Sequence, residues 1–150
     1  MLMQEQLKLD NQLCFRLYTA SRLITQAYHP LLSAIGLTYP QYLVMMVLWE
    51  KDGQPVNDIA RKLFLETNTV TPLLKRMEAA GLLNRSKGQA DARQVIVRLT
   101  PKGRALEKKA ECIPFEVGKA VVCHSITPES APALFQTLDD LIQTLAETRK

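Results

Sequence analysis

The chain has 150 residues, of which 47% are hydrophobic and 23% charged, with a formal net charge of +4. This balance is typical of one soluble globular domain and excludes a disordered or fibrous chain. A membrane span is excluded because no run of about 18 apolar residues is present. The first residues, MLMQEQLKLD, lack the apolar stretch of a secretion signal, so we expect a cytoplasmic protein.

The three cysteines, Cys14, Cys112 and Cys123, include no CxxC pair. An odd number of cysteines without that spacing indicates neither a disulfide framework nor a zinc site. We therefore expect free thiols and no metal. Neither His29 nor His124 has a histidine or cysteine four residues away, and His124 is expected at the surface. Since neither a glycine-rich phosphate loop nor a catalytic triad is present, we expect no cofactor and no enzymatic activity.

Apolar residues at helical spacing predict a long first helix from about residue 11 to 34, with a possible bend at Pro30. A second, very apolar helix is predicted over residues 39–50, where Pro40 fits the first turn. The turn KDGQP separates it from a short helix over residues 56–63. Trp49, Met45 and Met46 are expected in the core.

The segment NTVTPLLKRMEAAG predicts the most informative helix. Its buried stripe, at i, i+3, i+4 and i+7, consists of Val70, Leu73, Leu74 and Met77. Thr67 or Asn68 is expected to cap its N-terminus, and Pro72 places the helix start nearby. Gly81 is expected to end the helix. The opposite face consists of Asn68, Pro72, Lys75 and Ala79, with Thr69, Thr71 and Arg76 beside it.

Two strands, over residues 82–87 and 94–99, are predicted next, joined by the polar loop GQADAR. Thr100 and Pro101 predict the start of a helix that continues to about residue 122, and a last helix is expected over residues 128–148. Positive charge concentrates in the middle of the chain. The basic residues there are Arg76, Arg85, Lys87, Arg93 and Arg98, against only Glu78 and Asp91.

Two short helices followed by a hairpin predict a winged helix-turn-helix over about residues 39–99. We therefore expect a mainly α fold with a small β-hairpin wing, within a single chain of residues 1–150. The helices in residues 1–35 and 101–150 are too long and apolar for the winged unit alone. They are expected to form a dimerisation domain.

Three segments, LTYPQYLVMMVLWE, TVTPLLKRMEAAGLLNRS and DARQVIVRLTPKGRAL, resemble the MarR family of winged-helix regulators. The segments LDNQLCFRLY and TYPQY narrow the resemblance to the organic hydroperoxide-sensing, OhrR-type branch. The resemblance covers about residues 9–110. It implies an obligate homodimer bound to a palindromic operator in double-stranded DNA, with no membrane partner.

The resemblance assigns DNA contact to the predicted recognition helix and wing. Asp91 and Arg93 match the D-x-R pair of the wing, whose arginine reaches the minor groove. The wing here reads DARQ, so Ala92 replaces an acidic residue common in this branch. On the helix, Asn68 could read adenine and the threonines could meet phosphates or thymine methyls. The candidates are Thr67, Asn68, Thr69, Thr71, Lys75, Arg76, Arg85, Lys87, Asp91 and Arg93, of which Arg76, Arg85 and Lys87 are expected at phosphates.

Cys14 matches the peroxide-reactive cysteine of the branch, although a lone helical cysteine is more often a buried apolar residue. A position near a helix N-terminus favours the thiolate, and Tyr18 shares its face one turn later. Tyr28 and Tyr39 match the other tyrosines of the sensor pocket. Because 14 helical residues span about 21 Å, they must reach Cys14 by a sharp chain reversal or from another subunit. Cys112 and Cys123 are the candidate resolving cysteines, and we favour Cys123.

The sequence therefore predicts a dimeric repressor that senses an organic hydroperoxide by oxidation of Cys14 to sulfenic acid and then to a disulfide. One alternative is a repressor of the same fold that binds a small aromatic or lipid-like ligand, with Cys14 incidental. A thiol peroxidase and a winged helix used only for protein contacts are further alternatives. Peroxide turnover would indicate the first of these, and absence of salt-sensitive DNA binding the second.

Overall fold

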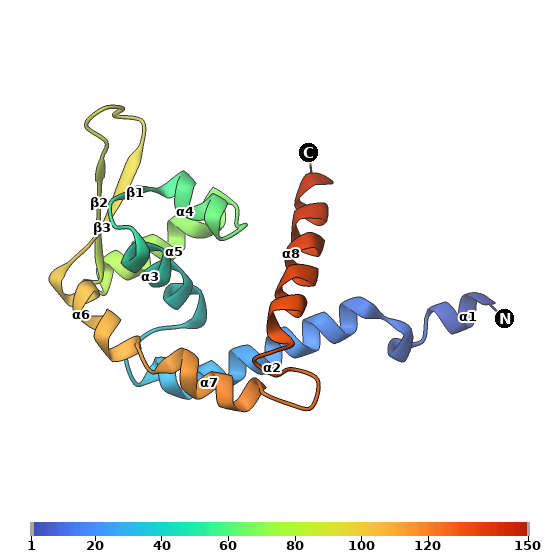
Figure 1. Cartoon of the computed structure of the whole chain (residues 1–150). Coiled ribbons are helices and arrows are strands. Elements are labelled where there is room, and N and C mark those ends of the chain that lie inside the picture. The colour runs from blue at the N-terminus through green and yellow to red at the C-terminus, as the bar shows by residue number, and fades with distance from the viewer. Residues whose placement is uncertain (1, 150) are drawn as a thin grey trace.

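Helices form most of the chain in the computed structural model, which describes residues 2–149 (Figure 1). The helices are α1 (Leu2–Gln6), the 3₁₀ turn η1 (Leu9–Asn11), α2 (Leu13–Ser33), α3 (Tyr39–Glu50), α4 (Val56–Lys62), α5 (Thr67–Ala79), α6 (Pro101–Ala110), α7 (Ile113–Val121) and α8 (Ala131–Glu147). The strands are β1 (Gln54–Pro55), β2 (Leu83–Lys87) and β3 (Val95–Leu99). The predicted mainly α fold with a small hairpin is confirmed.

The capping of α3 fixes its start where the sequence predicts it. The Thr38 hydroxyl accepts from the Gln41 backbone N–H at 3.4 Å, and the Gln41 side chain accepts from the Thr38 N–H at 3.1 Å. This reciprocal box satisfies two N–H groups that a helix start leaves unpaired. Met45 is fully buried, as predicted, whereas Met46 and Trp49 are half-buried against the core.

The helix-turn-helix consists of α4 and α5. All four residues of the predicted stripe of α5 are buried, which confirms the orientation of this helix: Val70, Leu73, Leu74 and Met77. The predicted cap is wrong. Glu66 is the N-cap residue and makes no side-chain cap bond, while Thr67 and Asn68 already lie inside the helix. Gly81 adopts φ +76°, a left-handed conformation that suits glycine just beyond a helix end, as predicted.

The sheet has the strand order β1-β3-β2, with both pairs antiparallel. Leu83 pairs with Leu99 and Lys87 with Val95, which confirms the predicted hairpin. β1 is not among the predicted strands, because two residues ending in proline have no strand pattern of their own. The side chain of Asp52 ties this region together. Its Oδ1 accepts from the Leu99 N–H at 2.9 Å, and its Oδ2 accepts from Arg104 at 2.7 Å.

Two predicted helices have different bounds in the structure. The helix expected from Pro101 to about residue 122 is broken into α6 and α7. Pro114 explains the break, because proline has no N–H to continue a helix but fits a first helical turn. The last helix begins at Ala131 rather than at residue 128. Before it, Thr127 and Ser130 bond one another through side chains and backbone, as in a turn.

The flanking helices leave much apolar surface uncovered. α2 and α7 lie side by side, whereas α8 projects away from them as an arm (Figure 1). Only Leu32 of α2 and no residue of α8 is buried. The exposed large apolar residues of α2, α7, α8 and the segments that flank them are Leu7, Leu9, Leu13, Phe15, Tyr18, Leu23, Ile24, Phe115, Val122, Leu134, Phe135, Ile142 and Leu145. Within residues 2–149, no helix is both long and apolar enough to cross a bilayer.

The start of α6 is pressed against Leu82, in the segment between α5 and β2, which makes Gly103 a sensitive position. A Cβ at Gly103 would lie 2.0 Å from the Leu82 carbonyl oxygen, and the Gly103 carbonyl accepts from Trp49 Nε1 at 3.1 Å. We expect Gly103→Ala to lower the free energy of unfolding by about 1–3 kcal/mol, as overpacking does, measured by urea denaturation.

Gly118→Ala in α7 is the matched control, because an added Cβ there has no neighbour within 4 Å. Alanine is the better helix former, so this variant should be neutral or up to about 1 kcal/mol more stable. Equal stability losses in both variants would contradict the steric explanation.

Candidate functional site

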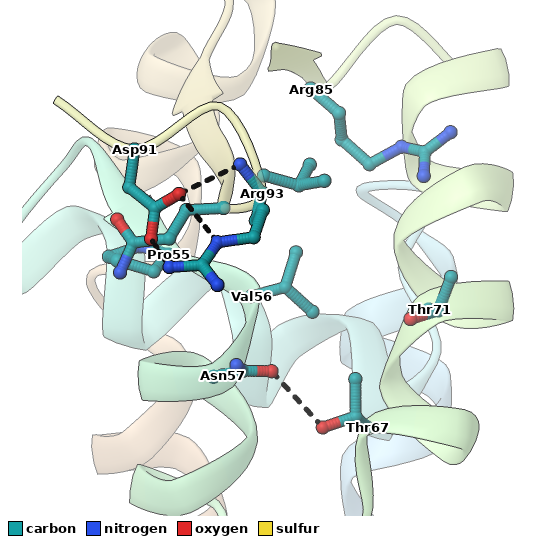
Figure 2. A pocket seen from close by; sticks show the side chains of 10 residues that line it. Pro55, Val56, Asn57, Thr67, Thr71, Arg85, Asp91 and Arg93 are labelled. Atoms are coloured by element: carbon teal, nitrogen blue, oxygen red, sulfur yellow. Dashed lines mark hydrogen bonds and ion pairs between the residues drawn. The ribbon is translucent and has the colours of Figure 1, made fainter. Parts of the chain in front are cut away.

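A groove of about 500 Å³ lies between the helix-turn-helix and the wing (Figure 2). The start of α4 forms its floor, α5 one wall, and β2 with the loop before β3 the other. Its lining residues are Pro55, Val56, Asn57, Thr67, Thr71, Arg85, Asp91, Arg93, Gln94 and Val95. Five of the ten DNA-contact candidates are therefore brought together here: Thr67, Thr71, Arg85, Asp91 and Arg93.

The other five candidates lie outside the groove. Asn68, Thr69, Lys75 and Arg76 are exposed on α5. They extend the polar face opposite its buried stripe, because 100° per residue separates the two faces. Lys87 lines a separate hollow on the wing with Gly88 and Arg98. The candidate surface is thus a groove flanked by an exposed helix face.

Asp91 holds Arg93 at the tip of the wing. The Asp91 Oδ1 accepts from the Arg93 backbone N–H at 3.0 Å and from its Nε at 3.2 Å. These bonds lower the pKa of the Asp91 carboxyl, the backbone bond contributing most and the side-chain bond next. The Arg93 side chain is nevertheless 92% exposed, so its guanidinium is oriented yet open to a partner.

Arg85 is a less available cation than the sequence suggests. Its Nη2 lies 3.3 Å from the Glu78 Oε1, and its backbone N–H donates to the Glu78 Oε2 at 2.7 Å. Only 22% of its side chain is exposed, and its buried Nε has no hydrogen-bond partner among the described residues. Arg85 therefore links β2 to α5, and the Glu78 carboxylate compensates part of the positive charge that Arg85 brings to the groove.

Asn57 is a groove residue that the sequence analysis missed. It lies in the first turn of α4, and its Oδ1 accepts from the Thr67 hydroxyl at 3.3 Å (Figure 2). A single exposed asparagine has no pattern that marks it. Its position ten residues before the start of α5 is the only signal that the sequence offers. The contact with Thr67 itself depends on the angle between α4 and α5.

Cys14 is the second residue of α2 and is exposed, and Tyr18 is 69% exposed one turn later. Tyr28 and Tyr39 instead contact one another near the other end of α2, with ring centroids 5.1 Å apart, and Tyr42 joins them. Burial and then the neighbouring Tyr39 raise the pKa of Tyr28, so its hydroxyl keeps its proton. The structure therefore separates the four candidate sensor residues into two pairs.

A sharp chain reversal cannot reunite these pairs, because α2 is continuous from Leu13 to Ser33. Fourteen residues of that helix separate Cys14 from Tyr28 by about 21 Å. Of the two ways in which Tyr28 and Tyr39 could reach Cys14, the sharp chain reversal is therefore excluded. A complete pocket of Cys14, Tyr18, Tyr28 and Tyr39 would require a second copy of the chain.

The remaining thiols lie at the two ends of α7. Cys112 is its N-cap residue, and Cys123 follows it in a turn closed by two backbone bonds with Ile126. Both are exposed and free. His124 is exposed as predicted, and His29 is exposed as well. Within the described part of the chain, no group of three histidine, cysteine or acidic side chains could hold a metal ion.

Comparisons of the sequence point to one group of regulators. Residues 26–110 match the family described as Transcriptional regulator SarA/Rot. The chain is 51% identical over 110 residues to the HTH-type transcriptional regulator TtmR of Methylorubrum extorquens (strain PA1), covering 73% of this chain but only 56% of TtmR. It is 40% identical over 141 residues to the Organic hydroperoxide resistance transcriptional regulator of Bacillus subtilis (strain 168), covering 94% of both chains.

Solved structures of AbfR, a protein of Staphylococcus epidermidis, share the fold. Reduced AbfR bound to DNA matches with a TM-score of 0.74 and 40% identity, covering 95% of this chain and 98% of that one. Disulfide-formed AbfR matches with a TM-score of 0.63 and 42% identity, covering 94% and 97%. Overoxidised AbfR bound to DNA matches with a TM-score of 0.75, so the described arrangement is more similar to the DNA-bound structures of AbfR than to the disulfide-formed one.

The bonds between Asp91 and Arg93 predict a partial effect of Arg93→Ala. Removing the guanidinium should raise the pKa of Asp91 toward its ordinary value but not restore it, because the backbone N–H of residue 93 remains as donor. An NMR titration of the carboxyl carbons measures this change, with Glu129 as an unchanged control.

The lowered pKa of Asp91 sets the direction of the pH dependence of this contact. The carboxylate holds Arg93 at neutral pH and loses this hold only as the pH falls through the lowered pKa of the folded state. A pKa that does not move in Arg93→Ala would show that the side-chain bonds are absent in solution.

Proposed function

The chain belongs to the SarA/Rot and MarR-type family of winged-helix transcriptional regulators, and on that basis we propose that it is a DNA-binding repressor released by organic hydroperoxides through oxidation of Cys14. The carrying observation is the position of Cys14, an exposed thiol in the first turn of α2 one turn from Tyr18. Similarity over 94% of the chain to a regulator named for organic hydroperoxide resistance supports the same reading.

The groove and the outer face of α5 would form the DNA-reading surface. A helix of this kind enters the major groove with its first residues against base edges. Thr67, Asn68 and Thr69 occupy those positions, while Arg93 at the wing tip reaches the flanking minor groove. Lys75 and Arg76 on α5, Arg85 on β2 and Lys87 on the wing would meet phosphates, which contribute affinity without sequence preference.

The uncovered apolar faces of α2, α7 and α8 support a homodimer. Apolar surface of this extent is unfavourable in water and usually marks an interface. A second copy related by two-fold symmetry would cover it and would bring Tyr28 and Tyr39 of that copy to Cys14. Two reading heads about 34 Å apart would then match the half-sites of a palindromic operator.

The signalling chemistry would begin at the Cys14 sulfur. The thiolate attacks the distal oxygen of the hydroperoxide, the O–O bond breaks, and an alcohol leaves after taking up a proton. Cys14 is thereby oxidised to sulfenic acid. A second thiol, Cys123 or Cys112, then attacks that sulfur, and a disulfide forms with release of water. Because the bridged Cα atoms must lie within about 7 Å, the bond would shift the helices that orient the reading heads.

A second candidate function has its own structural support. A hollow of about 570 Å³ between α3 and the α6–α7 junction is lined by Tyr42, Met46 and Trp49, with Arg104 and Lys108 at its edge. Its aromatic surface would suit a small aromatic or lipid-like ligand that releases DNA without oxidation. Cys14 would then be incidental.

Wild type and Cys14→Ser distinguish the two functions. We expect one equivalent of cumene hydroperoxide per subunit to weaken wild-type binding to the gene's upstream DNA by at least about tenfold, or about 1.4 kcal/mol. The serine variant should stay bound, because it has no thiolate to oxidise. A fluorescence anisotropy titration measures both affinities.

Release of both proteins by the peroxide would reject Cys14 as the sensor, and retention of both would favour the ligand-binding alternative. Loss of many equivalents of peroxide per subunit in the presence of a thiol reductant would indicate a peroxidase instead.

The choice of resolving cysteine has a separate test. After oxidation of wild type, we expect non-reducing electrophoresis to show a covalent dimer, because Cys14 would join Cys123 of a second copy. Cys123→Ser should remain monomeric on the gel and accumulate sulfenic acid, while Cys112→Ser behaves as wild type. The reverse pattern would assign the role to Cys112, and a sulfenic acid without any covalent dimer would show that Cys14 acts alone.

A further inference from the structure

The two helices of the helix-turn-helix are joined by a hydrogen bond at the edge of the groove. The Thr67 hydroxyl donates to the Asn57 Oδ1 at 3.3 Å, from the first residue of α5 to the first turn of α4 (Figure 2). Both side chains are exposed and line the groove. This bond therefore orients a hydroxyl at the position where a recognition helix first meets base edges.

The direction of this bond decides what Thr67 can bind. A threonine hydroxyl has one proton to donate and two lone pairs that accept. Because its proton is directed to Asn57, Thr67 can offer a further partner only its lone pairs. Phosphate oxygens are acceptors too, so they are poor partners for a hydroxyl held in this way. The exocyclic amino groups of adenine and cytosine are the donors that the major groove presents.

Asn57 keeps its own donors available. Its carbonyl oxygen faces Thr67, and its Nδ2 group makes no hydrogen bond to any other described residue. An amide NH₂ group can donate two hydrogen bonds. At the groove edge its natural partner is an acceptor, and the phosphates of DNA are the abundant acceptors there. The pair thus presents the Asn57 amide as a donor and the Thr67 hydroxyl oxygen as an acceptor, side by side.

We propose that Asn57 is a specificity-determining positioning residue, which holds Thr67 as an acceptor for the amino group of an adenine or a cytosine while its own amide donates to a phosphate. The inference rests on the proposed DNA-binding function and deepens it. It assigns Thr67 to base recognition rather than to the phosphate contact that a threonine could otherwise make.

Two variants at one position separate the two roles of Asn57. Asn57→Asp retains an oxygen that accepts from Thr67 but removes the amide donor and adds negative charge. It should bind every DNA sequence more weakly and keep its base preference. Asn57→Ala removes both groups, so it should lose affinity and also the preference at the base pair that Thr67 reads.

The measurement compares affinities for operator duplexes in which single adenines or cytosines are replaced by analogues lacking the exocyclic amino group. For wild type and Asn57→Asp, one replacement should weaken binding by roughly 2- to 10-fold, the range of one hydrogen bond. The same replacement should have no effect on Asn57→Ala or Thr67→Val. Whether the sensitive base is adenine or cytosine identifies the amino group.

Three controls exclude a general structural effect. Asn84→Ala removes an exposed amide on β2 that does not line the groove, and it should leave both affinity and preference unchanged. Asn57→Ala and Thr67→Val should be non-additive, since they remove one interacting pair. Asn57→Ala and Thr71→Val should be additive, because no hydrogen bond joins these two side chains among the described residues.

A base preference that survives in Asn57→Ala, or is lost in Asn57→Asp, would overturn the inference while leaving DNA binding intact. Absence of salt-dependent DNA binding by wild type would instead overturn the proposed function and this inference together.

Discussion

The close contact between the backbones of Gly103 and Leu82 is the constraint on which the proposed DNA-reading surface depends. The Leu82 carbonyl accepts from the Thr100 N–H at 3.1 Å, and the Thr100 hydroxyl donates to the Gly81 carbonyl at 2.6 Å. These bonds fix the end of the wing against the end of α5. Trp49 adds α3 to the same junction through Gly103. β2 begins and β3 ends beside this junction, so the junction sets the angle between the wing and α5.

The groove follows from that angle. With the wing anchored at its base, the ion pair between Arg85 and Glu78 holds β2 along α5, and Asp91 holds Arg93 at the open end. The wing therefore carries one arginine near the junction whose charge is compensated, Arg85, and one exposed arginine at its tip, Arg93. The wing is thus held firmly at its junction with α5 and carries an open cation at its tip. This arrangement suits the proposed role of fitting DNA in one register and binding it reversibly.

The continuity of α2 imposes a second constraint, on the proposed sensor pocket rather than on the proposed DNA-reading surface. A single helix separates Cys14 from Tyr28, and the aromatic cluster of Tyr28, Tyr39 and Tyr42 continues to Trp49, with 6.3 Å between the last two ring centroids. Trp49 bonds the junction at Gly103. In the proposed dimer, the cluster that meets Cys14 of one copy would thus lie in direct contact with the residues that anchor the wing of the other.

The sequence by itself determined the local structure: the start of α3, the buried stripe of α5, the end of α5 at Gly81, and the hairpin. Proline, capping and periodicity act over one or two helical turns, so these features can be predicted from neighbouring residues. The capping rule failed for α5, where Glu66 is the N-cap residue. The break before Pro114 follows from a local proline rule, although one continuous helix is predicted across it. Only the tertiary structure determined the pairing of β1 with β3, the ion pair between Arg85 and Glu78, and the hydrogen bond between Asn57 and Thr67. Each of these depends on the angle at which distant segments meet, which no local pattern records.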